Sequence, residues 1–452
     1  MKSLRLARKS KIVTVMKFTE GLLGLGRQDL EVKLLYIHLS KSEMGFKMTF
    51  EQDYLELLGQ INHLTKEVTG VGIVDAYFGP RSLSPDRTKS HLPSEKFLIN
   101  LNMLVGKSEQ IDNELKRTAI VSDLESIETV VRWLSGEDIP YVRLVEEIFG
   151  IVPRKFGQKE IRKAQQSVEG ASADLHGVDI SEKILRWREE SKITGEALKR
   201  MVDTEILTRT RNIRTLFKKK VLAHLPGKVE NKGIIYKTVQ GEPWTAYNYY
   251  QGNYRSVNAI NVDMPLNRYK LALALWHEYE HHVANLFKEK YYRENKALDL
   301  VAVLLHTKRS VIDEGTADCA REFLDLKFEG ENTQLVESLN KLEKMAGLNA
   351  AYMLNVENVD EETAAEYTSS ETFRPVEDAR RANAFRKPIT SDGRPNFFKP
   401  YDYTYFFGKT DYVLPTLRKA QKKDKVKEFF QTLYLNPYSR SSATWKIAFA
   451  KI

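Results

Sequence analysis

Cysteine is almost absent from this chain of 452 residues, which contains only Cys319. One thiol excludes an intrachain disulfide and is weak evidence for a metal ligand, so we expect Cys319 to be a small core residue. The sequence also lacks a repeat of fixed period, a low-complexity linker and any run of about 18–20 apolar residues. We therefore expect no integral membrane association.

Outside the first 47 residues, positive and negative side chains nearly balance. Residues 1–47 hold ten Lys and Arg against four Asp and Glu, so the other 405 residues carry only +3 of the net +9. This balance argues against an extended phosphate-binding face, and we expect no nucleic-acid partner. Residues 1–47 are predicted to be a basic extension without a secretory signal, because the apolar run is short and no small-residue cleavage site follows. Together with the single cysteine, this predicts a cytoplasmic location.

The hydrophobic pattern changes twice along the chain. Apolar residues recur at helical spacing over 48–226, which predicts a helical lobe. Within 227–330, the segments GIIYKTV, PWTAYNYY and NYRSVNAINVDMP are rich in Ile, Val, Thr and Tyr, as in antiparallel strands. Residues 331–452 return to a helical pattern that is broken near Pro415. We predict a mainly α fold with a small antiparallel sheet.

The most informative stretch is Leu271–His282, LALALWHEYEHH, which contains His277, Glu278 and His281. Two histidines four residues apart on a helix lie one turn apart on the same face, so both imidazoles can reach one cation. Glu278 lies beside His277 and can hold the water that such a metal polarises. This is the HExxH arrangement of zinc peptidases, and it predicts a catalytic zinc ion with Glu278 as general base.

A third ligand is predicted from the next helical segment, SVIDEGTAD. Glu314 and Asp318 are also four residues apart and share a helical face. Catalytic zinc takes three protein ligands and leaves the fourth position open, so we assign Glu314 as the third ligand. Asp318 is then expected to accept a hydrogen bond from a ligating imidazole and to set its tautomer.

With these residues the segment Leu271–Leu326 resembles the gluzincins, the thermolysin-like clan defined by HExxH on one helix and Glu with a trailing Asp on the next. The resemblance implies a zincin-like, helical, bilobal architecture and a peptide substrate. In gluzincins a small sheet precedes the HExxH helix, and its edge strand binds the substrate backbone. By that resemblance Arg255–Asp263 is the edge strand, and Asn258 and Asn261 offer hydrogen bonds to substrate, although turn-forming or structural Asn residues fit equally well.

Two aromatic segments are further candidates for the site. A zinc peptidase needs a donor that stabilises the oxyanion, and the sequence TYFFG makes Tyr405 our candidate, with Tyr403 second. With 21 tyrosines in the chain, packing roles compete with both assignments. The segment VDAYFGP at residues 74–80 is interpreted either as an aromatic wall of the cleft or as a packing elbow closed by Gly-Pro.

Two other classes of function share these sequence features. A metal-dependent amide or ester hydrolase that does not act on peptides would have the same motif residues and a different cleft. A non-catalytic helical interaction protein would have HEYEHH as an accidental surface patch. Taken singly, a histidine on an apolar helix is also more often a core residue than a metal ligand. Stoichiometric zinc in the purified protein distinguishes the last class from the other two.

Overall fold

The structure is a computed structural model that describes residues 49–88, 93–242, 244–326 and 333–452. The predicted basic extension 1–47 lies outside these residues. Helices make up most of the described chain before the sheet, as the sequence pattern predicts. They are α3 (Phe50–Thr69), α4 (Ser94–Ser108), α5 (Glu114–Leu134), α6 (Tyr141–Phe149), α7 (Gln158–Ala171), α8 (Ile180–Ser191) and α9 (Gly195–Lys220).

Helix α6 illustrates how the sequence pattern produces these elements. Its residues Tyr141, Leu144, Val145 and Ile148 recur at helical spacing and are all buried. The helix ends at Gly150, which adopts a left-handed conformation with φ of 70° that a side chain would disfavour. Its apolar face packs on α5 and on the later helix α11 (Lys308–Asp318).

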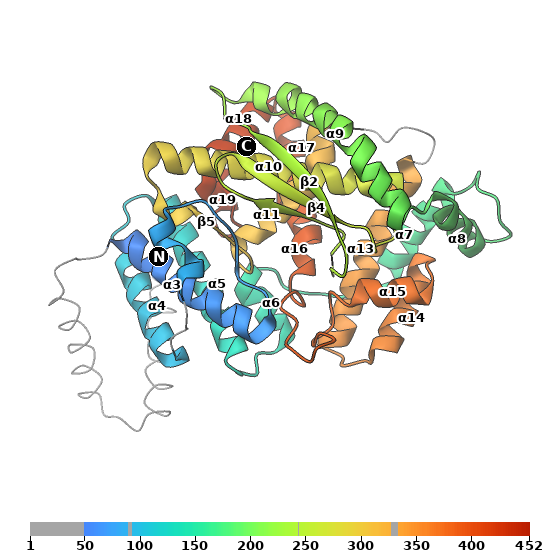
Figure 1. The fold of residues 1–452 in the computed structure, drawn as a ribbon. Helices are drawn as coiled ribbons and strands as arrows, with labels where there is room; N and C mark the ends of the chain where they lie inside the picture. Colours follow the sequence, from blue (N-terminus) through green and yellow to red (C-terminus); the bar gives the residue numbers. More distant parts are fainter. Residues whose placement is uncertain (1–48, 89–92, 243, 327–332) are drawn as a thin grey trace. The chain divides into compact units, whose positions relative to one another are not determined.

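The small sheet contains β2 (Gly233–Val239), β4 (Arg255–Asn261) and β3 (Ala246–Tyr250), in that order. β3 runs antiparallel to β4, as predicted, whereas β2 runs parallel to β4. The sheet packs on α10 (Arg268–Asn295) through β3 and β4, and α9 packs along β2 (Figure 1). The mainly α fold with a small sheet is confirmed, and one of its two strand pairs is parallel.

A second, two-stranded pairing joins distant parts of the chain. β1 (Val74–Tyr77) pairs antiparallel with β5 (Ala302–Leu304), and a register shift between Val74 and Ala76 forms a β-bulge at Asp75. The aromatic residues that follow have packing roles, because Phe78 is buried with its ring 5.7 Å from that of Tyr250. For these aromatic residues the packing elbow is the better interpretation.

The chain after α11 is again helical. Its elements are α12 (Ala320–Leu324), α13 (Thr333–Asn355), α14 (Glu361–Thr372), α15 (Val376–Asn383), α16 (Asp402–Phe407), α17 (Leu414–Lys422), α18 (Val426–Leu435) and α19 (Trp445–Ala448). A π-helical turn over Gly408–Val413 separates α16 from α17. Pro415 is the second residue of α17 and has no N–H to donate into the preceding turn, which accounts for the predicted break.

Two glycines allow α11 to approach the π-helical turn closely. A Cβ on Gly408 would lie 2.0 Å from the carbonyl oxygen of Val311, and a Cβ on Gly315 would lie 2.4 Å from the carbonyl carbon of Gly408. No side chain can occupy either position without moving one backbone away from the other. Because Glu314 is the neighbour of Gly315, this contact also determines where the predicted zinc ligand lies.

Residues Phe50–Ile452 form one compact unit. The boundaries predicted at 226 and 330, and the bilobal zincin-like arrangement, stay predictions. No helix in the described ranges is long and apolar enough to span a bilayer.

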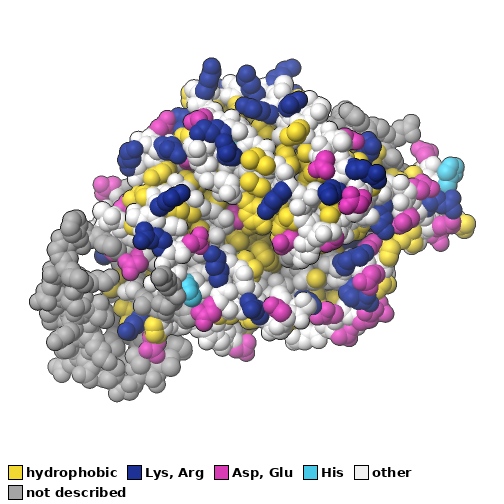
Figure 2. Space-filling model, in the orientation of Figure 1, with side chains coloured by type: hydrophobic (Ala, Val, Ile, Leu, Met, Phe, Trp, Pro, Cys, Tyr) yellow, Lys and Arg dark blue, Asp and Glu magenta, His cyan; other side chains and the backbone are white. Residues whose placement is uncertain are grey.

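On the face in Figure 2, acidic and basic side chains are interspersed, with Lys and Arg gathered along the top of the view. Helix α9 lies there in Figure 1, and its exposed basic residues are Lys199, Arg200, Arg211, Arg214, Lys218 and Lys219.

We predict that Gly408→Ala destabilises the protein by about 1–3 kcal/mol, because the added methyl overpacks the contact with α11. The control is Gly106→Ala in α4, where a Cβ meets nothing within 4 Å. That change is expected to be neutral or to stabilise by up to about 1 kcal/mol through helix propensity. Urea unfolding followed by circular dichroism measures both, and equal stability of the two variants would contradict the close-approach argument.

Candidate metal centre

Helix α10 carries both motif histidines near its middle. The helix begins after Asn267, whose side-chain oxygen accepts a hydrogen bond from the backbone N–H of Lys270 and so caps the first turn. His277 and His281 then lie one turn apart, and their Nε2 atoms are 3.0 Å from each other. Both rings therefore direct the same nitrogen toward one point, as the spacing predicts.

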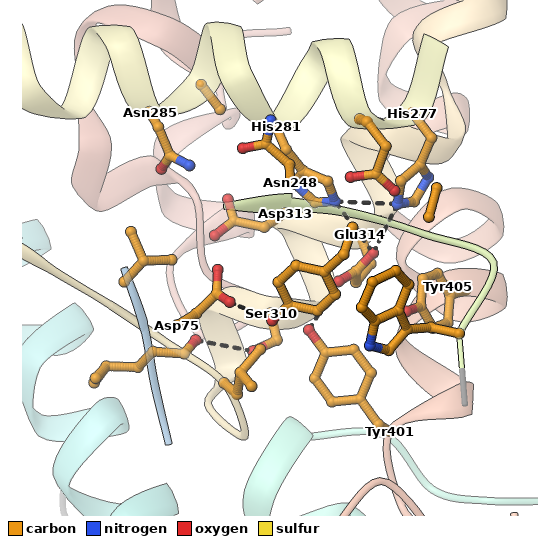
Figure 3. A pocket seen from close by; sticks show the side chains of 18 of the residues that line it. Asp75, Asn248, His277, His281, Asn285, Ser310, Asp313, Glu314, Tyr401 and Tyr405 are labelled. Carbon is orange, nitrogen blue, oxygen red and sulfur yellow. Dashed lines mark hydrogen bonds and ion pairs between the residues drawn. The ribbon is translucent and has the colours of Figure 1, made fainter. Parts of the chain in front are cut away.

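Helix α11 brings Glu314 to the same point. Its Oε2 atom lies 3.2 Å from Nε2 of His277 and 3.5 Å from Nε2 of His281. Figure 3 shows the three side chains converging from the two helices. Their ligand atoms all lie within 4.8 Å of one another, as in a group that could hold a metal ion.

The separations agree with the requirements of zinc. Tetrahedral bonds of about 2.0–2.2 Å place ligand atoms roughly 3.3–3.6 Å apart, close to the three distances observed here. Oε2 of Glu314 is buried and has no hydrogen-bond partner among the described residues. A buried carboxylate oxygen without a donor is costly, and a cation between the three atoms would satisfy it. The donor set of two imidazoles and one carboxylate therefore fits zinc.

Asp318 contacts the other side of the His277 ring, as predicted. Its Oδ1 lies 3.1 Å from Nδ1 of His277, so a proton on Nδ1 leaves the lone pair of Nε2 directed at Glu314. Asp318 is itself held by an ion pair with Lys344, and Lys409 donates to its backbone carbonyl at 2.8 Å. The carboxylate thus stays ionised, and its pKa lies below its usual range because these cations and His277 outweigh the opposing effect of burial.

Tyr401 and Tyr405 project from the α16 region into the site. The hydroxyl of Tyr401 donates to Oε1 of Glu314 at 2.8 Å, which leaves Oε2 to face the histidines. The predicted Tyr405 lines the same cavity, and its ring centroid lies 5.9 Å from that of His277. Tyr403 is fully buried and donates to the carbonyl of Leu348, so it cannot reach a substrate.

The three converging side chains open onto a cavity of about 100 Å³. Glu278, the predicted general base, lines this cavity and is 8% exposed. The wall is polar along α10 and aromatic on the opposite side (Figure 3). Its other polar lining residues are Asp75, Asn248, Asn285, Lys288, Ser310 and Asp313.

Charges in the site favour a cation among the three ligand atoms. Burial raises the pKa of the Glu314 carboxyl, but the two histidines outweigh it and lower the pKa to about 2. Burial lowers the pKa of His277, yet the neighbouring carboxylates of Asp318 and Glu314 hold it well above its usual value. Positive charge at the centre of this group is therefore stabilised by the carboxylates around it.

The order of strands in the sheet disagrees with the predicted substrate contacts of Asn258 and Asn261, which assumed that β4 is an edge strand. β4 is the central strand and pairs on both sides, so its backbone cannot receive a substrate strand. The Asn261 side chain donates to the carbonyls of Glu242 and Trp244, and Asn258 accepts from Asn248 inside the sheet. Both are buried and neither lines the cavity, which leaves them structural roles.

Comparison with known proteins adds no family assignment. No family model matches the chain, and no curated protein matches it. Among solved structures, one match is described as the putative lipoprotein from Colwellia psychrerythraea. It is 14% identical with a TM-score of 0.49, and the alignment covers 88% of this chain and 70% of that one. At these values the likeness supports no statement about the function of this chain.

The cytoplasmic location predicted from the sequence is corrected here. The matched structure is described as a putative lipoprotein, which does not agree with a cytoplasmic location, and the prediction is withdrawn. Cysteine content and a short apolar run were its only grounds, and neither excludes another compartment. No other location is assigned to the chain, since the likeness is too distant to carry one.

Several cavity residues were missed by the sequence analysis. Asn285 and Lys288 follow His281 by four and seven residues and share its helical face, so their spacing was a usable signal. Tyr401 precedes Tyr405 by one turn, which was also visible. Asp75 lies about 200 residues before the motif, and nothing local in the sequence connects it with the site.

We predict that Asp318→Ala weakens zinc binding by about 10–100-fold, because His277 loses the acceptor that sets its tautomer and Lys344 is left uncompensated nearby. Competition with a chromophoric chelator measures the affinity. The matched control is Asp411→Ala, which removes the same charge from an exposed position. If both variants bind zinc as tightly as the unchanged protein, Asp318 has no part in the metal site.

Proposed function

We propose that this chain is a zinc-dependent hydrolase that cleaves peptide bonds, a metallopeptidase of the gluzincin type. The observation that carries the proposal is the convergence of His277, His281 and Glu314 within a cavity that Glu278 also lines. An accidental surface patch would not bury Glu314 and leave the two histidine side chains only 16% and 20% exposed. It would also not supply Asp318 and Tyr401 as separate partners for two of them.

Zinc bound by these three residues would polarise a carbonyl and lower the pKa of water at its open position to about 7. Glu278 accepts the proton of the attacking water and passes it to the leaving amine. Burial raises the pKa of the Glu278 carboxyl, while His277 and His281 oppose that effect, and the net shift is upward. A raised pKa suits a group that must both take and return a proton near neutral pH.

Tyr405 is the proposed donor to the developing oxyanion. Its ring lies beside His277 in the cavity, and no hydrogen bond joins its hydroxyl to another described residue. The hydroxyl of Tyr401 is engaged by Glu314, which makes it the less suitable donor. Burial raises the pKa of Tyr405 far above its usual value, so the phenol keeps the proton that it donates.

The substrate backbone is proposed to bind along β3, the edge strand on the cavity side of the sheet. Thr245 accepts from Asn261, and Gln251 donates to Arg255, so alternate residues of β3 bond to β4. By that alternation the backbone groups of Ala246, Asn248 and Tyr250 point to the open edge. Ala246 and Asn248 also line the cavity, where an extended peptide could pair with them.

We predict that Glu278→Gln keeps zinc bound but lowers kcat/KM by about 10²–10⁴, the usual effect of removing a general base. The test substrates are unstructured peptides and matched esters, with products followed by mass spectrometry and zinc content by elemental analysis. Glu294→Gln at the exposed end of α10 serves as the control.

Each outcome of this experiment separates the candidate functions. Hydrolysis of peptides that depends on zinc and on Glu278 supports the peptidase. Hydrolysis of esters alone assigns the non-peptidase hydrolase instead. Full activity of Glu278→Gln rejects the mechanism, and absence of stoichiometric zinc after metal reconstitution rejects the metal site itself.

A further inference from the structure

Asp75 enters the cavity from an irregular position in the fold. It is the extra residue of the β-bulge in β1, between Val74, which is opposite Leu304, and Ala76, which is opposite Val303. A bulge redirects side chains, and here the carboxylate of Asp75 lines the same cavity as the metal cluster. In the view of Figure 3, Asp75 lies on the opposite side of Glu314 from Tyr405.

No basic side chain among the described residues forms an ion pair with Asp75. Its hydrogen-bond partner is the hydroxyl of Tyr247 on β3, which is neutral and half-buried. Burial raises the pKa of the Asp75 carboxyl to about 6, although the Tyr247 hydrogen bond opposes that shift. At neutral pH the cavity therefore contains a partly desolvated negative charge with no lysine or arginine at ion-pair distance, and the electrostatic effects of His281 and Lys288 only partly offset burial.

The other acidic group at this end of the cavity is already neutralised. Asp313 accepts from Lys288 at 2.8 Å and from Arg440 at 2.8 Å. These bonds hold the pKa of Asp313 below its usual range, even though burial acts in the opposite direction. Lys288 is the one lysine or arginine that lines the cavity among the described residues, and this ion pair occupies it.

We infer that Asp75 is the substrate-recognition residue of this cavity, where it binds a positively charged nitrogen of the peptide close to the bond that is cleaved. The inference rests on the proposed hydrolase function and adds a substrate class to it. A substrate ammonium would supply the cationic partner that this half-buried carboxylate lacks. The side-chain amide of Asn285, one turn after His281 and in the same wall, offers a further acceptor for that ammonium.

The charges of the wall disfavour an anionic substrate group at this end. Four carboxylates line the cavity, from Asp75, Glu278, Asp313 and Glu314, against one lysine that is already paired. A substrate carboxylate near Asp75 would face repulsion without a free cationic side chain. The same ammonium chemistry can come from the free amino terminus of a peptide or from a lysine side chain, and the experiment below distinguishes these two sources.

Binding is measured by titration calorimetry with the zinc-loaded, full-length Glu278→Gln variant, in which the expected loss of about 10²–10⁴ in kcat/KM slows cleavage during the titration. The probes are a short alanine peptide amide with a free amino terminus, its N-acetylated form, and acetylated forms with one lysine at each position in turn. We expect a cationic probe to bind roughly 10–100-fold more tightly than the neutral acetylated peptide, as a charge-assisted hydrogen bond provides. A preference for the free amine identifies the amino terminus, and a preference for one lysine position identifies the side chain.

Three variants in the Glu278→Gln background separate recognition from structural support. Adding Asp75→Asn keeps an oxygen for Tyr247 but removes the charge, and it should abolish the cationic preference. Asp75→Glu should retain part of that preference. Tyr247→Phe removes the hydrogen bond and keeps the carboxylate, so the preference should persist. Loss of the preference in Tyr247→Phe to the same extent as in Asp75→Asn would instead make the pair a structural tie between β1 and β3.

The result is independent of whether the protein hydrolyses peptides. Equal binding of cationic and neutral probes, or a preference unchanged by Asp75→Asn, overturns the role of Asp75. Peptide hydrolysis by the unchanged protein that shows no charge preference would then leave the proposed function standing. Binding that depends on Asp75 without hydrolysis of any probe by the unchanged protein rejects the hydrolase and keeps the recognition site.

Discussion

The relative position of α10 and α11 depends on a buried arginine from the C-terminal part of the chain. Arg440 is 2% exposed and donates to Glu280 on α10 at 3.3 Å and to Asp313 on α11 at 2.8 Å. Glu280 precedes His281, and Asp313 precedes Glu314. Because a buried charge without its partner costs about 3–5 kcal/mol, other registers of the two helices are strongly disfavoured. One guanidinium thus helps to set the distances among the three proposed zinc ligands.

The same ion-pair network determines the electrostatics of the cavity. Lys288 points from α10 toward Asp313 and completes that carboxylate's bonding together with Arg440. Because the ammonium group of Lys288 is bound to Asp313, it does not form an ion pair with the carboxylate of Asp75. The two acidic groups at this end of the cavity consequently have different roles. Asp313 connects helices through its ion pairs. Asp75 keeps a negative charge that accepts a hydrogen bond from Tyr247 and is open to a ligand.

Parts of the site that depend on spacing within one helix could be predicted from the sequence. A helix places residues four apart on one face whatever surrounds it, so the pairs His277–His281 and Glu314–Asp318 each had a defined geometry. That the two helices would face each other followed from the need of catalytic zinc for a third ligand and from the gluzincin resemblance, and from no pattern within either helix. The packing that positions α11 includes Gly315 against Gly408 of the π-helical turn, a contact between segments 93 residues apart that no local pattern indicates.

Strand order and the bulge could not be predicted, because both depend on pairings between distant segments. The three strand patterns gave no indication that β2 would run parallel to β4 and leave β3 at the edge. Asn258 and Asn261 were therefore assigned to an edge strand when they lie in the central one. The position of Asp75 could not be predicted for the same reason, because one extra residue of β1 opposite β5 decides whether its side chain enters the cavity. A shift of one residue in that register would turn the carboxylate to the other face, so its presence in the cavity is a property of the β1–β5 pairing.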